Sequence, residues 1–440
     1  MDNLSEPELL ERANHAFEYA WSFVFGLFEE NHMDSQIQLA ARRLLSYNPQ
    51  HRVVEEKMPL LYGAVNTLCS IIKARINDLA QAETVENWTI LLFCYLLMND
   101  MPNAYTTAAH ALRLQPDISD PYFNYCAGIV YQHFHYYEDA IKFYKKPSDR
   151  FEQNIDRNFR LAIAYRSQAK YNESESLLRN LLKHPPANLK ANDIKFQLAY
   201  TLQLNDRNKE AANLYEELYS QNPRCHELIQ QYVWFLSFQD DSKSLSRAEE
   251  IIGDSTDSTL RFASARISMK LRDYNAAYLR YRDCTSSWSE SPLFWCGLGV
   301  LYLRNEQYPD SILAFQRALY LKNDIPEAWL NLGLIYEIQG ESPNAMKIYQ
   351  TAQSNCENAK IVNKRIAECE IPSRHSCPKE KLLKEILEID GKRLFEQPIE
   401  RYSEILVSYP PILSESCFNN DKSIQPQLVH LIQPYPSLFD

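Results

Sequence analysis

Glycine is scarce in this chain of 440 residues, which contains nine, whereas about 7% of the residues of an average protein are glycine. Glycine supplies the positive-φ positions of many tight turns, so we expect few turns of that kind. The shortage argues against β-rich folds and against nucleotide-binding folds with glycine-rich loops. It favours helices joined by short polar links. Tyrosine is abundant at 28 residues, which suits the many spaces between packed helices.

Positive charge and long apolar runs are also lacking. The formal net charge is −11, and no run of lysine or arginine is long enough to form a basic face. We therefore expect no direct binding to nucleic acid or to an anionic membrane. The longest apolar run, Ile90–Met98, is too short to span a bilayer. Met1–Glu11 lacks the apolar core of a signal peptide, so we expect a soluble intracellular protein whose ten cysteines are mostly buried and reduced.

Motifs that carry chemistry are absent as well. There is no glycine-rich phosphate loop, no nucleophile elbow and no HExxH sequence. Cys369, His375 and Cys377 lie close together, but their spacing fits no established zinc pattern. We therefore predict that the protein is not an enzyme, with no catalytic residues, no cofactor and no metal site.

The main positive signal is a repeated pattern of seven positions. Two copies of the pattern lie 34 residues apart, and the residue class at each position is kept. The first copy consists of Trp295, Leu298, Gly299, Tyr302, Ser311, Phe315 and Ala318, and the second of Trp329, Leu332, Gly333, Tyr336, Ala345, Tyr349 and Ala352. When Pro292 and Pro326 are counted as position 1, these are positions 4, 7, 8, 11, 20, 24 and 27. This is the signature of the tetratricopeptide (TPR) repeat.

The spacing predicts two helices in each repeat. Positions 4, 7, 8 and 11 share one face of a first helix, and positions 20, 24 and 27 share one face of a second. Small residues at positions 8 and 20 let the two helices approach closely, and large residues fill the gap to the next repeat. One such hairpin cannot bury its own apolar face, so the repeats must stack. We therefore predict an all-α fold, a TPR superhelix (α-solenoid).

About ten repeats follow one another at this spacing. They begin near Glu18, Arg52, Val85, Pro121, Ile155, Asn192, His226, Ser258, Pro292 and Pro326. The repeats near Arg52 and His226 match poorly. In the latter, the polar stretch Gln239–Ser246 is predicted to link the two helices, and His184–Asn188 is predicted to form a loop between repeats.

The pattern divides the chain into three parts. Residues 1–17 form an N-terminal segment, residues 18–370 form the array, and residues 371–440 follow it. Within the last part we expect a linker, an amphipathic capping helix over Lys379–Phe395, and a proline-containing tail from Gln397 onward.

The concave groove of a TPR array is lined by positions 2, 5, 9 and 12 of each first helix. In four repeats these positions are rich in aromatic and aliphatic residues, and a Lys, Arg and Asn clamp for a peptide C-terminus is not found. Such a lining suits an amphipathic helix of a partner. The alternative is that these side chains pack against neighbouring repeats or the tail. The candidate protein-binding residues are Thr89, Phe93, Leu96, Tyr122, Tyr125, Ile129, Phe159, Phe196 and Tyr200.

Several strings resemble a particular family of TPR proteins. Ser291–Tyr302 resembles the NPxFWCSIGVLYY stretch of the Cyc/Ssn-type general transcriptional corepressor, and UTX histone demethylases share a related stretch. Glu327–Glu337 resembles EVWYDLGTLYE, and Asp193–Leu198 resembles DIWFQLG. Further similarities, in the same order along the chain, are Leu228–Trp234 to VLQQLGWL, Tyr274–Tyr281 to YTAAYDAF, and Trp88–Leu112 to a repeat containing CYLMLDDLQRAY.

The resemblance implies a nuclear adaptor protein. In that family the N-terminal repeats, corresponding to Glu18–Pro116 here, hold the helical N-terminal segment of a WD-repeat corepressor. Other repeats receive DNA-bound transcription factors, and histone deacetylases are recruited. The sequence departs from the family in lacking a long Gln-rich tail and a demethylase domain. It also replaces the glycine at position 8 in several repeats, with Leu92, Ala162, Ala199 and Ala265.

Two other interpretations remain open. The chain is alternatively a TPR scaffold subunit of another assembly, such as the anaphase-promoting ubiquitin ligase, whose TPR subunits usually dimerise through their own repeats. A glycosyltransferase with TPR repeats is the less favoured interpretation, because Ile371–Asp440 leaves no room for a catalytic domain.

Overall fold

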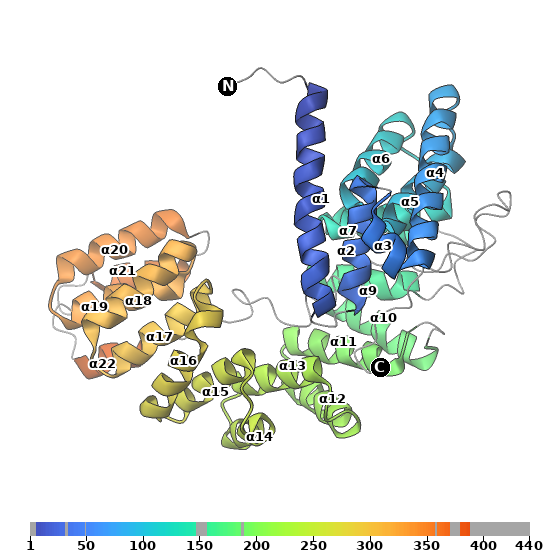
Figure 1. Cartoon of the computed structure of the whole chain (residues 1–440). Coiled ribbons are helices and arrows are strands. Elements are labelled where there is room, and N and C mark those ends of the chain that lie inside the picture. The colour runs from blue at the N-terminus through green and yellow to red at the C-terminus, as the bar shows by residue number, and fades with distance from the viewer. Residues whose placement is uncertain are drawn as a thin grey trace. The chain divides into compact units, whose positions relative to one another are not determined.

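A computed structural model describes residues 6–30, 34–48, 50–146, 156–185, 189–356, 359–369 and 379–387. These residues form helices and connecting turns, and no strand occurs among them (Figure 1). The predicted all-α fold is thereby confirmed. The chain divides into two compact units, and the boundary along the sequence lies between Asn222 and Pro223. Each unit is described here by itself.

Unit 1 contains the helices from α1 to α12. They are α1 (Glu6–Glu30), α2 (Asp34–Tyr47), α3 (Arg52–Lys57), α4 (Pro59–Gln81), α5 (Val85–Leu97), α6 (Met101–Leu114), α7 (Pro121–His133), α8 (Tyr137–Lys145), α9 (Asp156–Ser167), α10 (Tyr171–Lys183), α11 (Ala191–Leu204) and α12 (Asn208–Gln221).

Unit 2 contains the helices from α13 to α22. They are α13 (His226–Ser237), α14 (Ser242–Ile252), α15 (Ser258–Lys270), α16 (Tyr274–Trp288), α17 (Pro292–Arg304), α18 (Tyr308–Leu321), α19 (Pro326–Ile338), α20 (Ser342–Asn355), α21 (Lys360–Cys369) and α22 (Lys379–Lys384).

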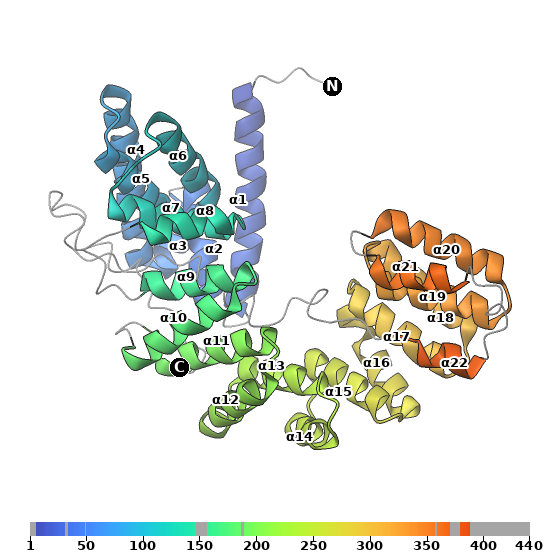
Figure 2. The same cartoon turned by 180° about the vertical axis from the view of Figure 1, so that it is seen from behind.

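From Val85 to Asn355 the helices follow one another as hairpins. The first helix of each hairpin begins at the predicted repeat start or one residue from it, as α7 does at Pro121 and α11 at Ala191. Each first helix packs against the second helix of its own hairpin, and within each unit successive hairpins stack (Figures 1 and 2). The 34-residue period therefore located these helices correctly.

The first two predicted repeats differ from the pattern. Helix α1 begins at Glu6, well before the start expected near Glu18, because residues 8–25 contain neither glycine nor proline to interrupt a helix. Near Arg52 there is no hairpin of two similar helices. A short helix of 6 residues, α3, precedes α4 with 23 residues.

The link predicted over Gln239–Ser246 is shorter than expected. Helix α14 begins at Ser242, because the carboxylate of Asp241 caps it by accepting a hydrogen bond of 2.8 Å from the backbone N–H of Ser244. Hydrogen bonds from Ser244 lower the pKa of Asp241, so the cap stays ionised at neutral pH. The loop predicted over His184–Asn188 falls in part outside the described residues.

The expectation of few positive-φ turns is wrong. In seven hairpins position 15, between the two helices, has positive φ, and glycine occupies only the last of these positions, at Gly340. The other six residues are Asn99, His135, Ala169, Asp206, Arg272 and Glu306, with φ between 55° and 63°. Backbone hydrogen bonds that close each first helix offset the strain, such as the 2.9 Å bond from Asp100 N to Tyr95 O.

Small residues and aromatic rings meet where the helices of a hairpin cross. A Cβ added at Gly128 would lie 2.4 Å from Cε1 of Tyr144, and one added at Gly333 would lie 2.1 Å from Cε1 of Tyr349. Both aromatic rings are buried. In these two hairpins the ring at position 24 occupies the space that a side chain at position 8 would need.

A hydrogen bond between positions 24 and 12 fixes the same ring. The Tyr144 hydroxyl donates to Oε1 of Gln132 at 2.9 Å, and the Tyr215 hydroxyl donates to Oε1 of Gln203 at 3.0 Å. Tyr349 donates in the same way to Oε1 of Glu337, at 2.6 Å. The buried hydroxyl is satisfied, and the second helix is held in one register against the first.

The end of unit 2 is closed by α21 and the residues around α22. The Asn331 side chain, on α19, donates to the Leu387 carbonyl at 2.8 Å and accepts from the Leu387 N–H at 3.0 Å. Arg365, on α21, pairs with Glu337 and Glu385. The capping helix was predicted over Lys379–Phe395; the structure places α22 at Lys379–Lys384, and residues 388–395 lie outside the described part.

The crossing contact predicts opposite effects of two glycine substitutions in unit 1. Gly128→Ala should lower the free energy of unfolding by about 1–3 kcal/mol, because the methyl group must displace the Tyr144 ring. Gly63→Ala is the matched control, since an added Cβ there meets no atom within 4 Å. It should stabilise α4 by up to about 1 kcal/mol. Urea unfolding followed by circular dichroism measures both, and equal effects would contradict the contact.

Candidate functional site

Most of the residues predicted to line the groove of unit 1 are buried. Thr89 and Tyr122 are partly exposed, and the Thr89 hydroxyl donates to the Val85 carbonyl at 2.8 Å. The other seven, each at most 4% exposed, are Phe93, Leu96, Tyr125, Ile129, Phe159, Phe196 and Tyr200. These seven side chains offer almost no exposed apolar surface. This agrees with the alternative that they pack against neighbouring parts of the chain. Their role in partner binding stays a prediction.

Two buried tyrosines of unit 1 lie beside arginines, and the candidate residues predicted from the sequence include no arginine. The guanidinium of Arg160 lies 5.9 Å from the ring centroid of Tyr125. The guanidinium of Arg166 lies 4.9 Å from the ring centroid of Tyr200, and Nη1 of Arg166 donates to Oε1 of Gln197 at 2.7 Å. This face of unit 1 is therefore cationic and aromatic as well as apolar.

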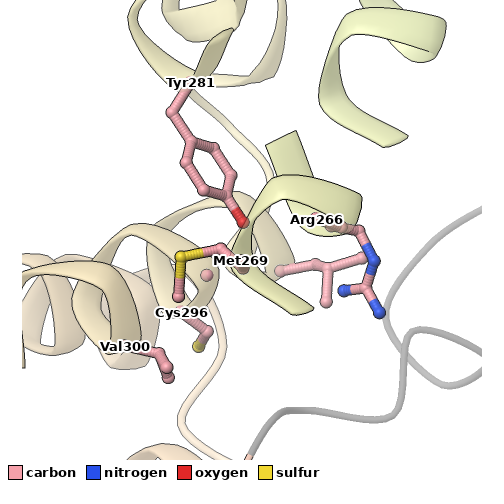
Figure 3. Close-up of a pocket in the computed structure, with 7 residues that line it drawn as sticks. Arg266, Met269, Tyr281, Cys296 and Val300 are labelled. Atoms are coloured by element: carbon pink, nitrogen blue, oxygen red, sulfur yellow. The ribbon is translucent and has the colours of Figure 1, made fainter. Parts of the chain in front are cut away.

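Unit 2 contains a small recess between α15, α16 and α17. The recess has an accessible volume of about 20 Å³, which is room for one water molecule or a methyl group. In Figure 3 the labelled side chains come from these three helices, and the guanidinium of Arg266 points away from Met269 and Cys296. It is lined by Arg266, Met269, Tyr281, Leu293, Cys296, Gly297 and Val300.

Four of these residues occupy groove positions of the repeat. Arg266 and Met269 are positions 9 and 12 of the repeat that begins at Ser258, and Cys296 and Val300 are positions 5 and 9 of the next. The candidate residues named from the sequence all lie between Thr89 and Tyr200, so unit 2 contributed none. The same positional rule, continued into unit 2, is the signal that identifies this recess.

Arg266 is the residue with unusual surroundings. Its side chain is 8% exposed, and its guanidinium lies 5.4 Å from the ring centroid of Trp234 and 4.3 Å from that of Phe238. Its buried Nε has no hydrogen-bond partner, and no carboxylate in the described part of the chain forms an ion pair with it. A buried cation without an anion costs stability. Such a group marks a position where a ligand with negative charge is favoured.

Met269 and Tyr281 complete the wall beside Arg266. Met269 stands at position 12, where Gln132, Gln203 and Glu337 accept a hydrogen bond from tyrosine in other repeats. The Tyr281 ring reaches the next hairpin instead, and its hydroxyl oxygen would lie 2.6 Å from a Cβ added at Gly297. The wall is therefore mainly apolar next to the guanidinium.

The thiol of Cys296 supplies another apolar contact. Burial raises the pKa of Cys296 well above its usual value, and the nearby carboxylate of Glu327 raises it further. The thiol therefore stays protonated at neutral pH and is a poor nucleophile. The recess is therefore a small space lined by apolar atoms and by Arg266.

Neither a metal centre nor a membrane segment is found in the part of the chain that the structure describes. No group of three or more His, Cys, Asp or Glu side chains there is placed to hold a metal ion. His375 and Cys377 lie outside that part. None of its helices is both long and apolar enough to cross a bilayer.

Comparisons with known proteins identify the repeats. Two tetratricopeptide-repeat family profiles match the chain, one at residues 262–324 and the other at residues 326–358. The matched segments include the recess and its neighbouring hairpins. Tetratricopeptide repeats mediate protein–protein interactions, so the protein has the character of a scaffold.

Solved structures with the same type of fold are distant in sequence. A tetratricopeptide repeat protein from Parabacteroides merdae has 10% identity and a TM-score of 0.36, over 70% of this chain and 100% of that one. The APC/C hetero-tetramer Cut9-Hcn1 has 12% identity and a TM-score of 0.40, over 79% of this chain and 64% of the other. Similarity at this level concerns the fold alone.

The recess predicts contrasting effects of two arginine substitutions in unit 2. Arg266→Met should leave the free energy of unfolding unchanged or raise it by about 1–2 kcal/mol, because it removes a buried cation that has no ion pair among the described residues and whose Nε lacks a hydrogen-bond partner. Arg280→Met is the comparison. Arg280 donates to Oε1 of Glu249 at 2.8 Å and to the Ser264 carbonyl at 3.1 Å, so its loss should cost about 1–3 kcal/mol.

Chemical unfolding of both variants measures the difference. An Arg266→Met protein that is as destabilised as the Arg280→Met protein would show that Arg266 has a structural role in the fold.

Proposed function

We propose that this protein is a nuclear transcriptional corepressor adaptor, a TPR scaffold that joins DNA-bound transcription factors to a WD-repeat corepressor and to histone deacetylases. The scaffold character rests on the repeats and their fold. The corepressor assignment rests on the resemblance of several strings to the Cyc/Ssn-type family, in the same order along the chain.

The observation that supports the assignment most is the position of one of these strings in the fold. Ser291–Tyr302 covers most of α17, and it resembles NPxFWCSIGVLYY at residues beyond the TPR signature. Among them are Cys296 and Val300, which line the recess beside Arg266. The resemblance therefore includes residues of a binding surface, where packing of the repeat alone does not dictate the side chain.

The recess gives the proposal a binding mechanism. An acidic side chain of a partner can approach the buried guanidinium of Arg266, whose stacking on Trp234 and Phe238 holds it in one orientation. A small apolar residue of the same segment then enters the space beside Met269 and Cys296. The partner's carboxylate neutralises a charge that has no ion pair among the residues that the structure describes.

The adaptor role needs more than one such contact. We assign the helical N-terminal segment of the WD-repeat corepressor to the first repeats, Glu18–Pro116, and acidic segments of DNA-bound factors to unit 2. Each contact is small, but partners that are linked to one another raise each other's effective concentration along the array.

Affinity capture of the tagged full-length chain from its own cells, followed by mass spectrometry, tests the proposal. We expect a WD-repeat protein and histone deacetylase subunits with the unaltered chain. Arg266→Met should reduce recovery of the transcription factors at least about tenfold, because a desolvated charge pair is lost, while the WD-repeat protein is retained. Arg282→Met is the matched control, since the Arg282 side chain is 63% exposed.

The capture has two decisive negative outcomes. Ubiquitin-ligase subunits without a WD-repeat corepressor would overturn the corepressor assignment and favour the scaffold of that ligase. An unchanged set of partners with Arg266→Met would remove the recess from the mechanism.

A further inference from the structure

One face of α1 is apolar and exposed. Tyr19 is 79% exposed, Phe23 is 64% exposed and Leu27 is 41% exposed. Ala16 and Ala20 are exposed between them. Since these residues follow one another at intervals of one, three and four residues, they form a single stripe along the helix.

The opposite face of α1 is already used for packing within unit 1. Phe25 is 3% exposed, and Trp21 and Phe28 pack against the same core. The carboxylate of Glu18 accepts a hydrogen bond of 2.8 Å from the Asn48 side chain, and Glu29 pairs with Lys57. Figures 1 and 2 show α1 at the edge of unit 1, with the other helices of that unit to one side.

The exposed stripe differs from the usual end of a repeat array. Terminal repeats normally present a polar outer face, because no further repeat covers them. An exposed row of aromatic and aliphatic side chains marks an interaction surface instead. The residues that carry this row are in α1, the first helix that the structure describes.

The stripe has the spacing of a coiled-coil seam. Along the middle of the stripe, the spacing between successive residues alternates between four and three. This is the spacing of heptad positions a and d. These residues are Arg12, Ala16, Tyr19, Phe23, Gly26 and Glu30. A Cβ added at Gly26 would meet no atom within 4 Å, so the seam is open at this position. The seam is about 27 Å long at 1.5 Å per residue.

We propose that α1 pairs with α1 of a second copy of this chain, antiparallel, through this seam. In the antiparallel register centred at Trp21, Tyr19 of one copy lies opposite Phe23 of the other. Ala16 lies opposite Gly26 in the next layer. The small residues leave space for the aromatic rings, so large side chains of each helix enter gaps in its partner.

The charges at the two ends of the seam select the antiparallel direction. Arg12 and Glu30 are both exposed, and the same register places Arg12 of each copy opposite Glu30 of the other. A parallel pair would bring Arg12 against Arg12 and Glu30 against Glu30. Opposite charges attract and like charges repel across a helix pair, so the antiparallel dimer is favoured. The same two charge pairs form at both ends of this dimer.

Sedimentation velocity of the full-length chain over a wide range of concentrations tests the pairing. We expect a reversible dimer. Arg12→Glu alone and Glu30→Arg alone should each raise its dissociation constant about tenfold, because two attractive pairs become repulsive. The double variant, Arg12→Glu with Glu30→Arg, should restore the original constant, since the pairs form again with their charges exchanged.

A second pair of variants tests the apolar part of the seam. Phe23→Lys should abolish the dimer, and circular dichroism should show an unchanged fold because this side chain is exposed. Leu60→Lys, on α4, is the matched control: Leu60 is 65% exposed, as Phe23 is to within 1%, but it lies outside the seam. It should leave the dissociation constant unchanged.

Two results would overturn the proposal. One is a chain that stays monomeric at every concentration, which would leave the stripe to a different protein. The other is a dimer that persists with Phe23→Lys. Neither result bears on the recess at Arg266, because the seam and the recess share no residue.

Discussion

In the hairpins that begin at Pro121, Pro292 and Pro326, packing depends on one contact, the ring of position 24 against the bare backbone of position 8. At Gly128 and Gly333 the ring lies where a side chain would otherwise be. The contact sets how closely the two helices of these hairpins approach. In three hairpins a hydrogen bond from the tyrosine at position 24 to position 12 also fixes the ring, as between Tyr144 and Gln132. Groove residues of neighbouring hairpins can then lie at repeating distances from each other.

That regularity also explains why the recess in unit 2 stands apart. In the hairpin of α15 and α16 the acceptor at position 12 is replaced by Met269, and the Tyr281 ring reaches Gly297 of the next hairpin. The same hairpin places Arg266 between aromatic rings without an anion. The hydrogen bond that closes other hairpins is exchanged for a wall of apolar atoms around a cation. The fold is thus less favourable around Arg266, and a ligand with a negative charge would stabilise it there.

Much of this architecture could be predicted from the sequence, because the TPR signature is local. The period placed the first helices from Val85 onward at the correct residues. It did not place α1 or α4, which have 25 and 23 residues and do not follow the signature. Glycine content gave a wrong expectation about turns, because backbone hydrogen bonds hold Ala169 and Arg272 at positive φ. The groove rule was carried only as far as Tyr200 and named no residue of unit 2, although Arg266 stands at position 9. The contact of its guanidinium with Trp234 and Phe238 depends on packing between hairpins, which no spacing encodes.

Those turns have a thermodynamic consequence. Each non-glycine residue in the left-handed region costs about 1–2 kcal/mol, and six such residues recur at position 15 of their hairpins. Glycine at these positions would remove that local cost, but it would also give the unfolded chain more conformations to lose on folding. The six non-glycine residues therefore restrict the unfolded chain at the points where it must turn.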